Sequence, residues 1–163
     1  MSSPDSPVVF EVNDGVATIT LNRPEQMNTI NGELGSALIE SLREVRNRDD
    51  IRVAVITGNG RAFCAGADLR SRADGPAAAS GVAGLFRTDD APGFHEFDAK
   101  EPMSGAVNGY ALGGGFEIAL ACDRLIASEA ATFGLPEITL GFFPLAGAPV
   151  KLPRGISRTM AND

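Results

Sequence analysis

The sequence contains few of the cysteine and histidine residues that form zinc and redox sites. It has two cysteines, one histidine and no tryptophan, and Cys64 and Cys122 neither form a CxxC pair nor lie near His95. This pattern matches no common zinc motif, so we expect no metal site. We expect both cysteines to be buried thiols and His95 to be an ordinary surface residue.

Long apolar runs and an excess of positive charge are also missing. No apolar run approaches the length needed to span a bilayer, and the first seven residues are polar and contain proline, unlike a signal peptide. The 14 basic residues are outnumbered by 21 acidic ones, which gives a net charge of -7. A broad surface for nucleic acid or anionic membrane is therefore not expected, and we predict a cytoplasmic protein.

The composition is that of one soluble globular domain. Of the 163 residues, 44% are hydrophobic and 21% are charged, which is ordinary for such a protein. A chain of this length can bury a sizeable core. We therefore predict a single domain over residues 1–163.

Hydrophobic patterning in the first third of the chain predicts an α/β fold. Two β-type runs, Val8–Val12 and Val16–Leu21, flank the turn residues Asn13–Gly15 and predict a hairpin. Apolar residues at helical spacing predict an amphipathic helix over Asn31–Arg48. The β-branched run Ile51–Thr57 predicts a strand that is buried on both faces and reached by a helical crossover.

Small-residue segments follow this strand. Arg61–Leu69 comes at the C-terminal end of the strand, where open α/β sheets place their ligands. We interpret Asp68 there as a helix N-cap without a catalytic role. Ser71–Lys100 shows no sustained periodicity and predicts a loop or irregular helix over a cleft. Met103–Val107 predicts another buried strand, followed by a turn at Asn108-Gly109.

The segment Ala106–Asp123 carries an unusual carboxylate. Three glycines, residues 113–115, precede an apolar helix in which Glu117 is the only charge before Asp123. Glycines let the N–H groups at a helix N-terminus approach a ligand, and the helix dipole favours negative charge there, so the place could stabilise an oxyanion. Alternatively, the glycines allow tight helix packing and Glu117 interacts with the N-terminal end of its own helix.

A second isolated carboxylate follows two short predicted strands. These strands are Arg124–Ala127 and Ala131–Gly134, and Pro136 after them suits the first turn of a helix. Glu137 would be favourable near that N-terminus. Its apolar neighbours nevertheless invite a functional explanation: Ile138, Leu140, Phe142, Phe143 and Leu145.

Three segments in order give the chain a resemblance to a known family: ITGNGRAFCAGADL, AVNGYALGGGFEIALACD and FGLPEITLGFFP. They resemble the crotonase superfamily, specifically the enoyl-CoA hydratases, and the likeness covers Val8 to about Arg158. The resemblance implies a crotonase-like (ClpP/crotonase) spiral of repeated ββα units. It also implies an acyl-CoA thioester as substrate, no separate cofactor, and assembly into homotrimers or dimers of trimers.

The resemblance also implies roles for individual residues. Glu117 and Glu137 correspond to the two acid/base carboxylates, and the N–H groups of Ala67 and Gly114 to the oxyanion hole. The implied reaction adds water to an α,β-unsaturated thioester, whose oxygen gains negative charge in the transition state. The coenzyme A arm is expected to run along five positions: Gln26, Met27, Ala65, Ala67 and Leu69.

The sequence departs from the hydratase pattern after the second glutamate, where relatives are glycine-rich and then carry a Thr-Gln pair. This chain instead reads FPLAGAPVKLPR. Glu25 also stands where many relatives place a basic residue, so the phosphates of coenzyme A would depend on other side chains: Arg23, Arg61, Arg70 or Arg72. At Asp163 the chain ends before the helical C-terminal portion of the family, and Arg158–Asp163 predicts the opening of a helix.

Three functions therefore compete. The first is an enoyl-CoA hydratase of fatty-acid breakdown that uses Glu117, Glu137 and the two backbone amides. The second is an isomerase or hydrolase of the same superfamily, in which one carboxylate suffices. The third is a catalytically impaired CoA-binding or assembly subunit, which the missing C-terminal helices would suit.

Overall fold

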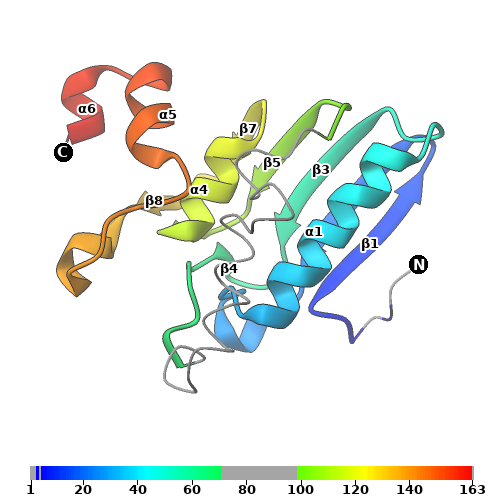
Figure 1. Ribbon diagram of the computed structural model, residues 1–163, viewed down its shortest axis with the longest axis horizontal. Coiled ribbons are helices and arrows are strands. Elements are labelled where there is room, and N and C mark those ends of the chain that lie inside the picture. Colours follow the sequence, from blue (N-terminus) through cyan, green and yellow to red (C-terminus); the bar gives the residue numbers. More distant parts are fainter. Residues whose placement is uncertain (1–2, 4, 71–98, 163) are drawn as a thin grey trace.

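The chain folds into two β-sheets with helices packed against them (Figure 1). The computed structural model describes residues 3, 5–70 and 99–162. Positions 71–98 are not described, so the prediction for His95 and all but the last two residues of the predicted loop Ser71–Lys100 lie outside the described residues.

The larger sheet has five strands in the order β1-β2-β3-β5-β7. Only β1 and β2 are antiparallel, as the two arms of the predicted hairpin, and each later strand is parallel to its neighbour. The strands are β1 (Val8–Asn13), β2 (Val16–Leu21), β3 (Val53–Gly58), β5 (Met103–Val107) and β7 (Arg124–Ala127).

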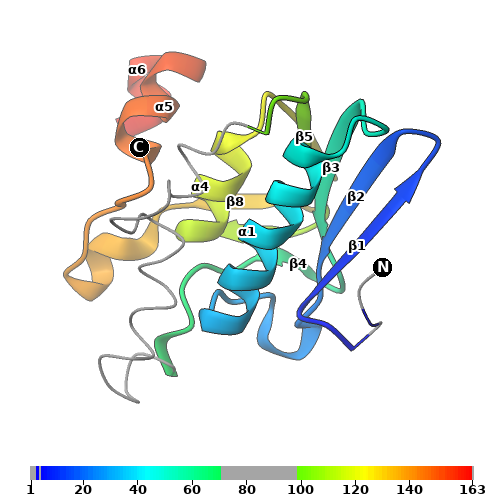
Figure 2. The same cartoon turned by 45° about the vertical axis from the view of Figure 1, so that its right-hand side comes forward.

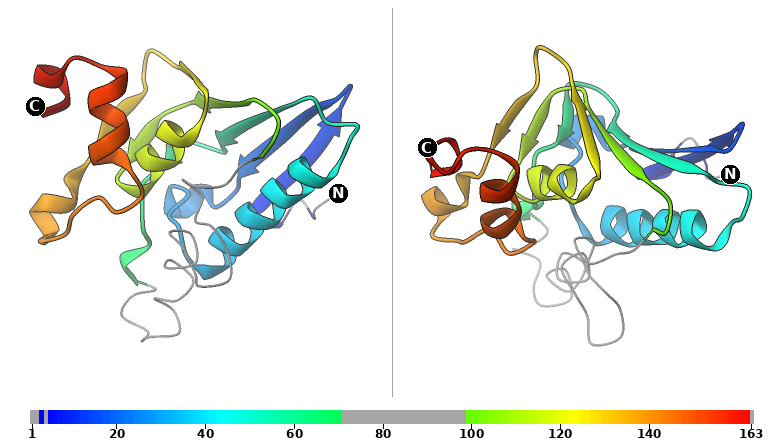
Figure 3. Two further views of the ribbon diagram at one scale, coloured as in Figure 1. Left: turned by 45° about the horizontal axis from the view of Figure 1, so that its top comes forward. Right: turned by 90° about the horizontal axis from the view of Figure 1, so that it is seen from above.

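The smaller sheet shows that the fold is built from repeated strand pairs. Its three parallel strands are β4 (Ala62–Cys64), β6 (Tyr110–Leu112) and β8 (Thr132–Gly134). Each pair β3-β4, β5-β6 and β7-β8 therefore gives one strand to each sheet, and successive pairs stack in parallel. The two views in Figure 3 show α1 beside the larger sheet and α4 (Gly114–Ala121) after the pair β5-β6. The predicted crotonase-like spiral of ββα units is confirmed.

Local signals place the first helix as predicted. Helix α1 (Gly32–Asn47) begins after Asn31, whose side chain accepts a hydrogen bond from the Leu34 N–H at 2.9 Å. Figure 2 shows α1 alongside the strands of the larger sheet. The helix contacts β1 and β2, and its apolar stripe is buried at Leu34, Leu38, Leu42 and Val45. The helix therefore supplies one wall of a single core.

The prediction that β3 is buried on both faces is wrong. Ala54 and Ile56 are fully buried, but the alternating residues Val53, Val55 and Thr57 are only half-buried. The helix α1 and the core cover one face of the sheet, and no second layer covers the other within the described part of the chain. Burial therefore alternates along β3 with the period of a strand.

The two thiols differ in burial. Cys64 is fully buried as predicted, whereas Cys122 is half-buried at the end of α4. Burial raises the pKa of each thiol to about 12. Both thiols therefore remain protonated near neutral pH, and neither is an activated nucleophile.

The last part of the chain forms short helices at the end of the molecule away from the hairpin (Figure 1). They are the 3₁₀ helix η3 (Pro136–Leu140), α5 (Ala148–Gly155) and α6 (Arg158–Asn162). Pro136 opens η3, and α6 confirms the helix predicted at Arg158. No helix in the described residues is long and apolar enough to cross a membrane.

Candidate active site

Glycines bring two distant backbone segments together at the start of α4. A Cβ added at Gly115 would lie 2.1 Å from the carbonyl oxygen of Cys64, and one at Gly66 would lie 2.9 Å from that of Leu112. Gly66 also has φ +90°, and Gly113, the N-cap of α4, has φ +54°. The backbone after β4 therefore lies directly against the first turn of α4, as the tight-packing interpretation of the glycines requires.

The N–H groups of Ala67 and Gly114 are available at this contact. Ile30 pairs with the backbone on either side of Ala67, because its N–H donates to Gly66 O and its carbonyl accepts from Asp68 N. In this parallel pairing the Ala67 N–H points away from Ile30. Gly114 is the first residue of its helix and has no acceptor one turn earlier. No hydrogen bond between described residues uses either group.

The carboxylate of Glu117 is buried and hydrogen-bonded. Only 2% of the residue is exposed, and Oε1 accepts bonds from Ala146 N at 2.7 Å and from Ala148 N at 3.2 Å. Glu117 lies in the first turn of α4, but its hydrogen-bond donors do not come from the N-terminal end of that helix. Its partners belong to the start of α5, which lies about 30 residues later in the sequence.

Burial is the main influence on the proton affinity of Glu117. Desolvation raises its pKa, the two backbone N–H bonds oppose this, the negative charge of Glu137 raises it further, and Lys151 lowers it. The net result is a pKa above the ordinary glutamate value of 4.5. A carboxyl group of this kind can give as well as take a proton nearer neutral pH.

Glu137, which belongs to η3, brings a second carboxylate to the N-cap of α4. A Cβ at Gly113 would lie 2.9 Å from Glu137 Oε1, so the glycine there leaves room for this carboxylate. Its other oxygen, Oε2, is buried and has no hydrogen-bond partner among the described residues. A buried acceptor of this kind is costly unless a donor such as water or a substrate group satisfies it.

Both carboxylates line a single cavity of about 130 Å³. Its lining includes Glu117, Glu137, Ala67 and Gly114. The remaining wall is made of glycine, proline and apolar residues: Ala65, Gly66, Leu69, Gly113, Pro136, Leu140, Phe142, Phe143 and Leu145. The structure therefore brings together the four residues predicted for the acid/base pair and the oxyanion hole.

A larger hollow of about 750 Å³ adjoins this cavity and shares Ala65, Ala67 and Leu69 with it. Gln26, the last residue of the short 3₁₀ helix η1 (Pro24–Gln26), and Met27, its C-cap, also line the hollow. All five positions predicted for the coenzyme A arm therefore lie along one surface. Of the four arginines considered for phosphate binding, Arg23 and Arg70 line the hollow, Arg61 does not, and Arg72 lies outside the described residues.

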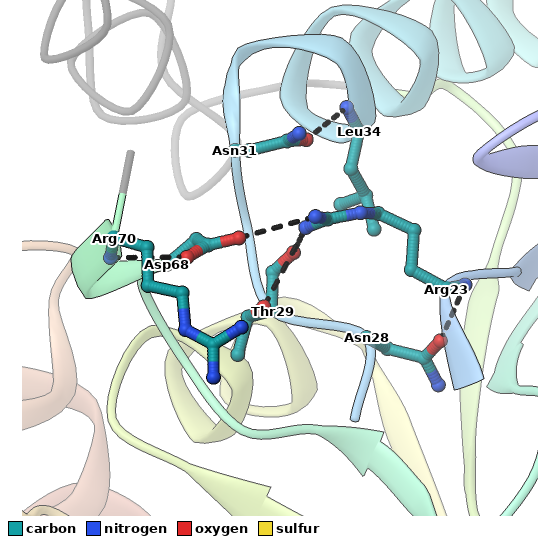
Figure 4. Close-up of polar contacts among 7 residues, drawn as sticks. All are labelled: Arg23, Asn28, Thr29, Asn31, Leu34, Asp68 and Arg70. Atoms are coloured by element: carbon teal, nitrogen blue, oxygen red, sulfur yellow. Dashed lines mark hydrogen bonds and ion pairs between the residues drawn. The ribbon is translucent and has the colours of Figure 1, made fainter. Parts of the chain in front are cut away.

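A polar network braces the wall of this hollow (Figure 4). Arg23 forms an ion pair with Asp68 at 3.1 Å, and Asp68 Oδ1 accepts from Arg70 N at 3.2 Å, which confirms its predicted capping position. Asn28, fully buried with φ +55°, accepts from Arg23 N and donates to the carbonyls of Ala62 and Phe63. Sequence reasoning missed both the ion pair and Asn28.

The raised pKa of Glu117 makes stability depend on pH. The folded chain keeps the Glu117 proton where the unfolded chain, with an ordinary value near 4.5, releases it. This contribution to stability is complete below the unfolded pKa and is lost as pH rises through the folded pKa. We therefore expect the free energy of unfolding of the wild type, relative to Glu117→Gln, to fall across that interval. Urea denaturation at a series of pH values measures it, and parallel curves for the two proteins would contradict it.

Among the described residues, no three His, Cys, Asp or Glu side chains are grouped so that they could hold a metal ion. Strand pairs that stack in parallel across two sheets, with a glycine-lined acidic cavity at the start of the helix after β6, define a crotonase-like protein. A family model described as enoyl-CoA hydratase/isomerase matches residues 11–163. The chain belongs to this family.

Individual relatives agree with this assignment. The chain is 42% identical to the (E)-benzylidenesuccinyl-CoA hydratase of Thauera aromatica over 156 residues, 95% of this chain and 60% of the relative. It is 43% identical to the 2,3-dehydroadipyl-CoA hydratase of Escherichia coli over 147 residues, 90% of this chain and 56% of that protein. The structure of an enoyl-CoA hydratase from Mycobacterium tuberculosis matches with a TM-score of 0.86 and 33% identity, covering 97% of this chain and 60% of that one. The chain thus spans about three fifths of the length of these relatives.

Proposed function

We propose that this chain carries the active site of an enoyl-CoA hydratase. The observation that supports this most directly is the meeting of Glu117, Glu137 and the unused N–H groups of Ala67 and Gly114 at one apolar cavity. An isolated carboxylate could serve packing or capping. Two carboxylates facing a pair of N–H donors match what hydration of a conjugated thioester requires.

In the proposed reaction, the thioester oxygen accepts hydrogen bonds from Ala67 and Gly114. Water adds to the β-carbon, and the electron pair of the carbon–carbon double bond moves toward the carbonyl, so negative charge builds on the thioester oxygen. One carboxylate takes a proton from the water, and the α-carbon receives a proton from a carboxyl group, which completes the addition. The apolar wall strengthens these electrostatic interactions by excluding bulk water.

The coenzyme A portion is proposed to occupy the larger hollow. The hollow and the cavity share Ala65, Ala67 and Leu69. A thioester bound at the N–H groups of Ala67 and Gly114 would therefore place its coenzyme A portion along Gln26 and Met27. Arg70 is a candidate for the phosphates. Arg23 is committed to its ion pair with Asp68 and is better suited to bracing the wall.

The direct test is the hydration of crotonyl-CoA by the 163-residue chain, followed as loss of the enoyl absorbance. We expect turnover, with formation of the 3-hydroxyacyl product. If the enoyl absorbance stays constant while calorimetry shows coenzyme A binding, the hydratase proposal fails and the CoA-binding subunit replaces it. Turnover of other acyl-CoA thioesters without hydration would instead favour the isomerase or hydrolase alternative.

Exposed apolar side chains support a proposal of assembly. Ile126 is 65% exposed, Ile138 80% and Met160 67%, all in the last 40 residues. Where such side chains form a contiguous patch, the patch marks contact with another protein surface. We propose the homotrimer or dimer of trimers that the family resemblance implies, and sedimentation showing only monomers at micromolar concentration would count against it.

A further inference from the structure

The orientation of Glu117 depends on a turn that lies outside its own helix. Ala146 and Ala148 are both buried, and their N–H groups donate to the same oxygen, Oε1. No hydrogen bond among the described residues engages the other oxygen, Oε2, of this cavity-lining residue. The two oxygens therefore differ in bonding, because Oε1 is held by backbone N–H groups and Oε2 remains available to a molecule in the cavity.

Gly147 makes this arrangement of donors possible. It lies between the two donors with φ +100° and ψ 0°, in the left-handed region. Turns that include a left-handed residue can direct neighbouring N–H groups at one anion. A Cβ at Gly147 would meet only the flexible side chain of Lys151, at 3.7 Å, so space does not require glycine here. The requirement is conformational.

We propose that the turn Ala146–Ala148 is the positioning element of Glu117, with Gly147 as its positioning residue. The turn fixes Oε1 and presents Oε2 to the water or to the acyl carbon. The catalytic task of Oε2 rests on the proposed hydratase function. The fixing of Oε1 does not, and it can be tested without any substrate.

Loss of the turn should raise the pKa of Glu117. Burial and Glu137 on η3 disfavour its carboxylate form, while the two N–H bonds and Lys151 on α5 favour it. If the two N–H bonds are weakened, burial and the charge of Glu137 are less strongly opposed, and the pKa of Glu117 rises further. A change that only loosened α5 far from the carboxylate would leave the titration where it is.

The experiment compares three variants of the 163-residue chain. Gly147→Ala strains the turn, Gly147→Asn tests rescue because asparagine tolerates the left-handed region better, and Gly155→Ala is the matched control on the same helix. The titration of Glu117 is followed by carbon-13 NMR of labelled glutamate, with Glu117→Gln for assignment. A Cβ at Gly155 meets nothing within 4 Å, so this control should titrate like the wild type.

For Gly147→Ala we expect an upward shift of the Glu117 titration and a fall in kcat of about 10- to 100-fold, with KM changed much less. Gly147→Asn should show smaller effects on both. If Gly147→Ala does not fold, amide exchange decides instead: Ala146 and Ala148 should lose protection in Glu117→Ala. Unchanged titration in Gly147→Ala, or unchanged protection in Glu117→Ala, overturns the proposal. A shifted titration in a chain that hydrates no enoyl-CoA supports the positioning turn and removes the hydratase function.

Discussion

Replacing either Glu117 or Glu137 by glutamine is expected to lower the rate of crotonyl-CoA hydration by about 10²- to 10⁴-fold. Glutamine has nearly the same shape but can neither take a proton from water nor give one to carbon. Glu117→Gln also keeps an oxygen that can accept from Ala146 and Ala148, so the turn should persist. Steady-state kinetics by enoyl absorbance, with thermal unfolding to verify the fold, measures the effect.

The control for this prediction is Glu129→Gln, which removes an exposed carboxylate that does not line the cavity. It should retain the wild-type rate. The double variant should fall less than the product of the single effects, because the two groups act on one transition state. Undiminished hydration in both single variants would show that the acidic pair is not the catalytic apparatus.

Replacing Gly115 by alanine is expected to destabilise the protein by about 3 kcal/mol or more, since overpacking against a rigid neighbour is among the costlier substitutions. The new Cβ would lie 2.1 Å from the carbonyl oxygen of Cys64 and 2.7 Å from its carbonyl carbon. Relief requires moving β4 away from α4, which also separates Ala67 from Gly114. For a chain of this size, the melting temperature should fall by roughly 6 to 12 °C.

The comparison variant is Gly155→Ala, a glycine in α5 with nothing within 4 Å of an added Cβ. It should melt within about 2 °C of the wild type, since open surface positions change stability little. Differential scanning calorimetry separates the two variants. Equal melting temperatures for Gly115→Ala and wild type would mean that β4 and α4 yield easily, and that the glycines are not needed for the close contact.

Local sequence signals were enough for the hairpin and the first helix, whereas η1 and β4 were not predicted. The hairpin follows from the turn residues Asp14 and Gly15, which both have positive φ, and the helix α1 follows from a capping Asn31 and a four-residue apolar stripe. These signals act between near neighbours, so a linear reading captures them. The prediction that β3 is buried on both faces failed, because the sequence of a single strand does not specify which layers cover the sheet.

The four residues predicted for the acid/base pair and the oxyanion hole line one cavity, but the hydrogen bonds that hold Glu117 there were not predicted. Glu117 and Glu137 stood out as charges in apolar surroundings, and the family resemblance supplied their pairing. The donors to Glu117 are backbone N–H groups, which leave no side-chain signature. Helix α5 (Ala148–Gly155) was not predicted. It contains Pro149 and Pro153, and proline disfavours a helix interior. Pro149 lies in the opening turn, where proline is tolerated.

The stacking of strand pairs has a consequence for how the chain reaches its fold. Apart from the hairpin β1-β2, strands become neighbours only after long stretches of chain are closed, as when Ala62 meets Tyr110 and Val16 meets Val53. Loop closure of this kind is entropically costly and slows folding. We expect the hairpin amides to gain protection first in pulse-labelled refolding, and those of β6 and β8 last. The cavity lined by Glu117 and Glu137 would then be among the final features to form, after the sheets and helices around it.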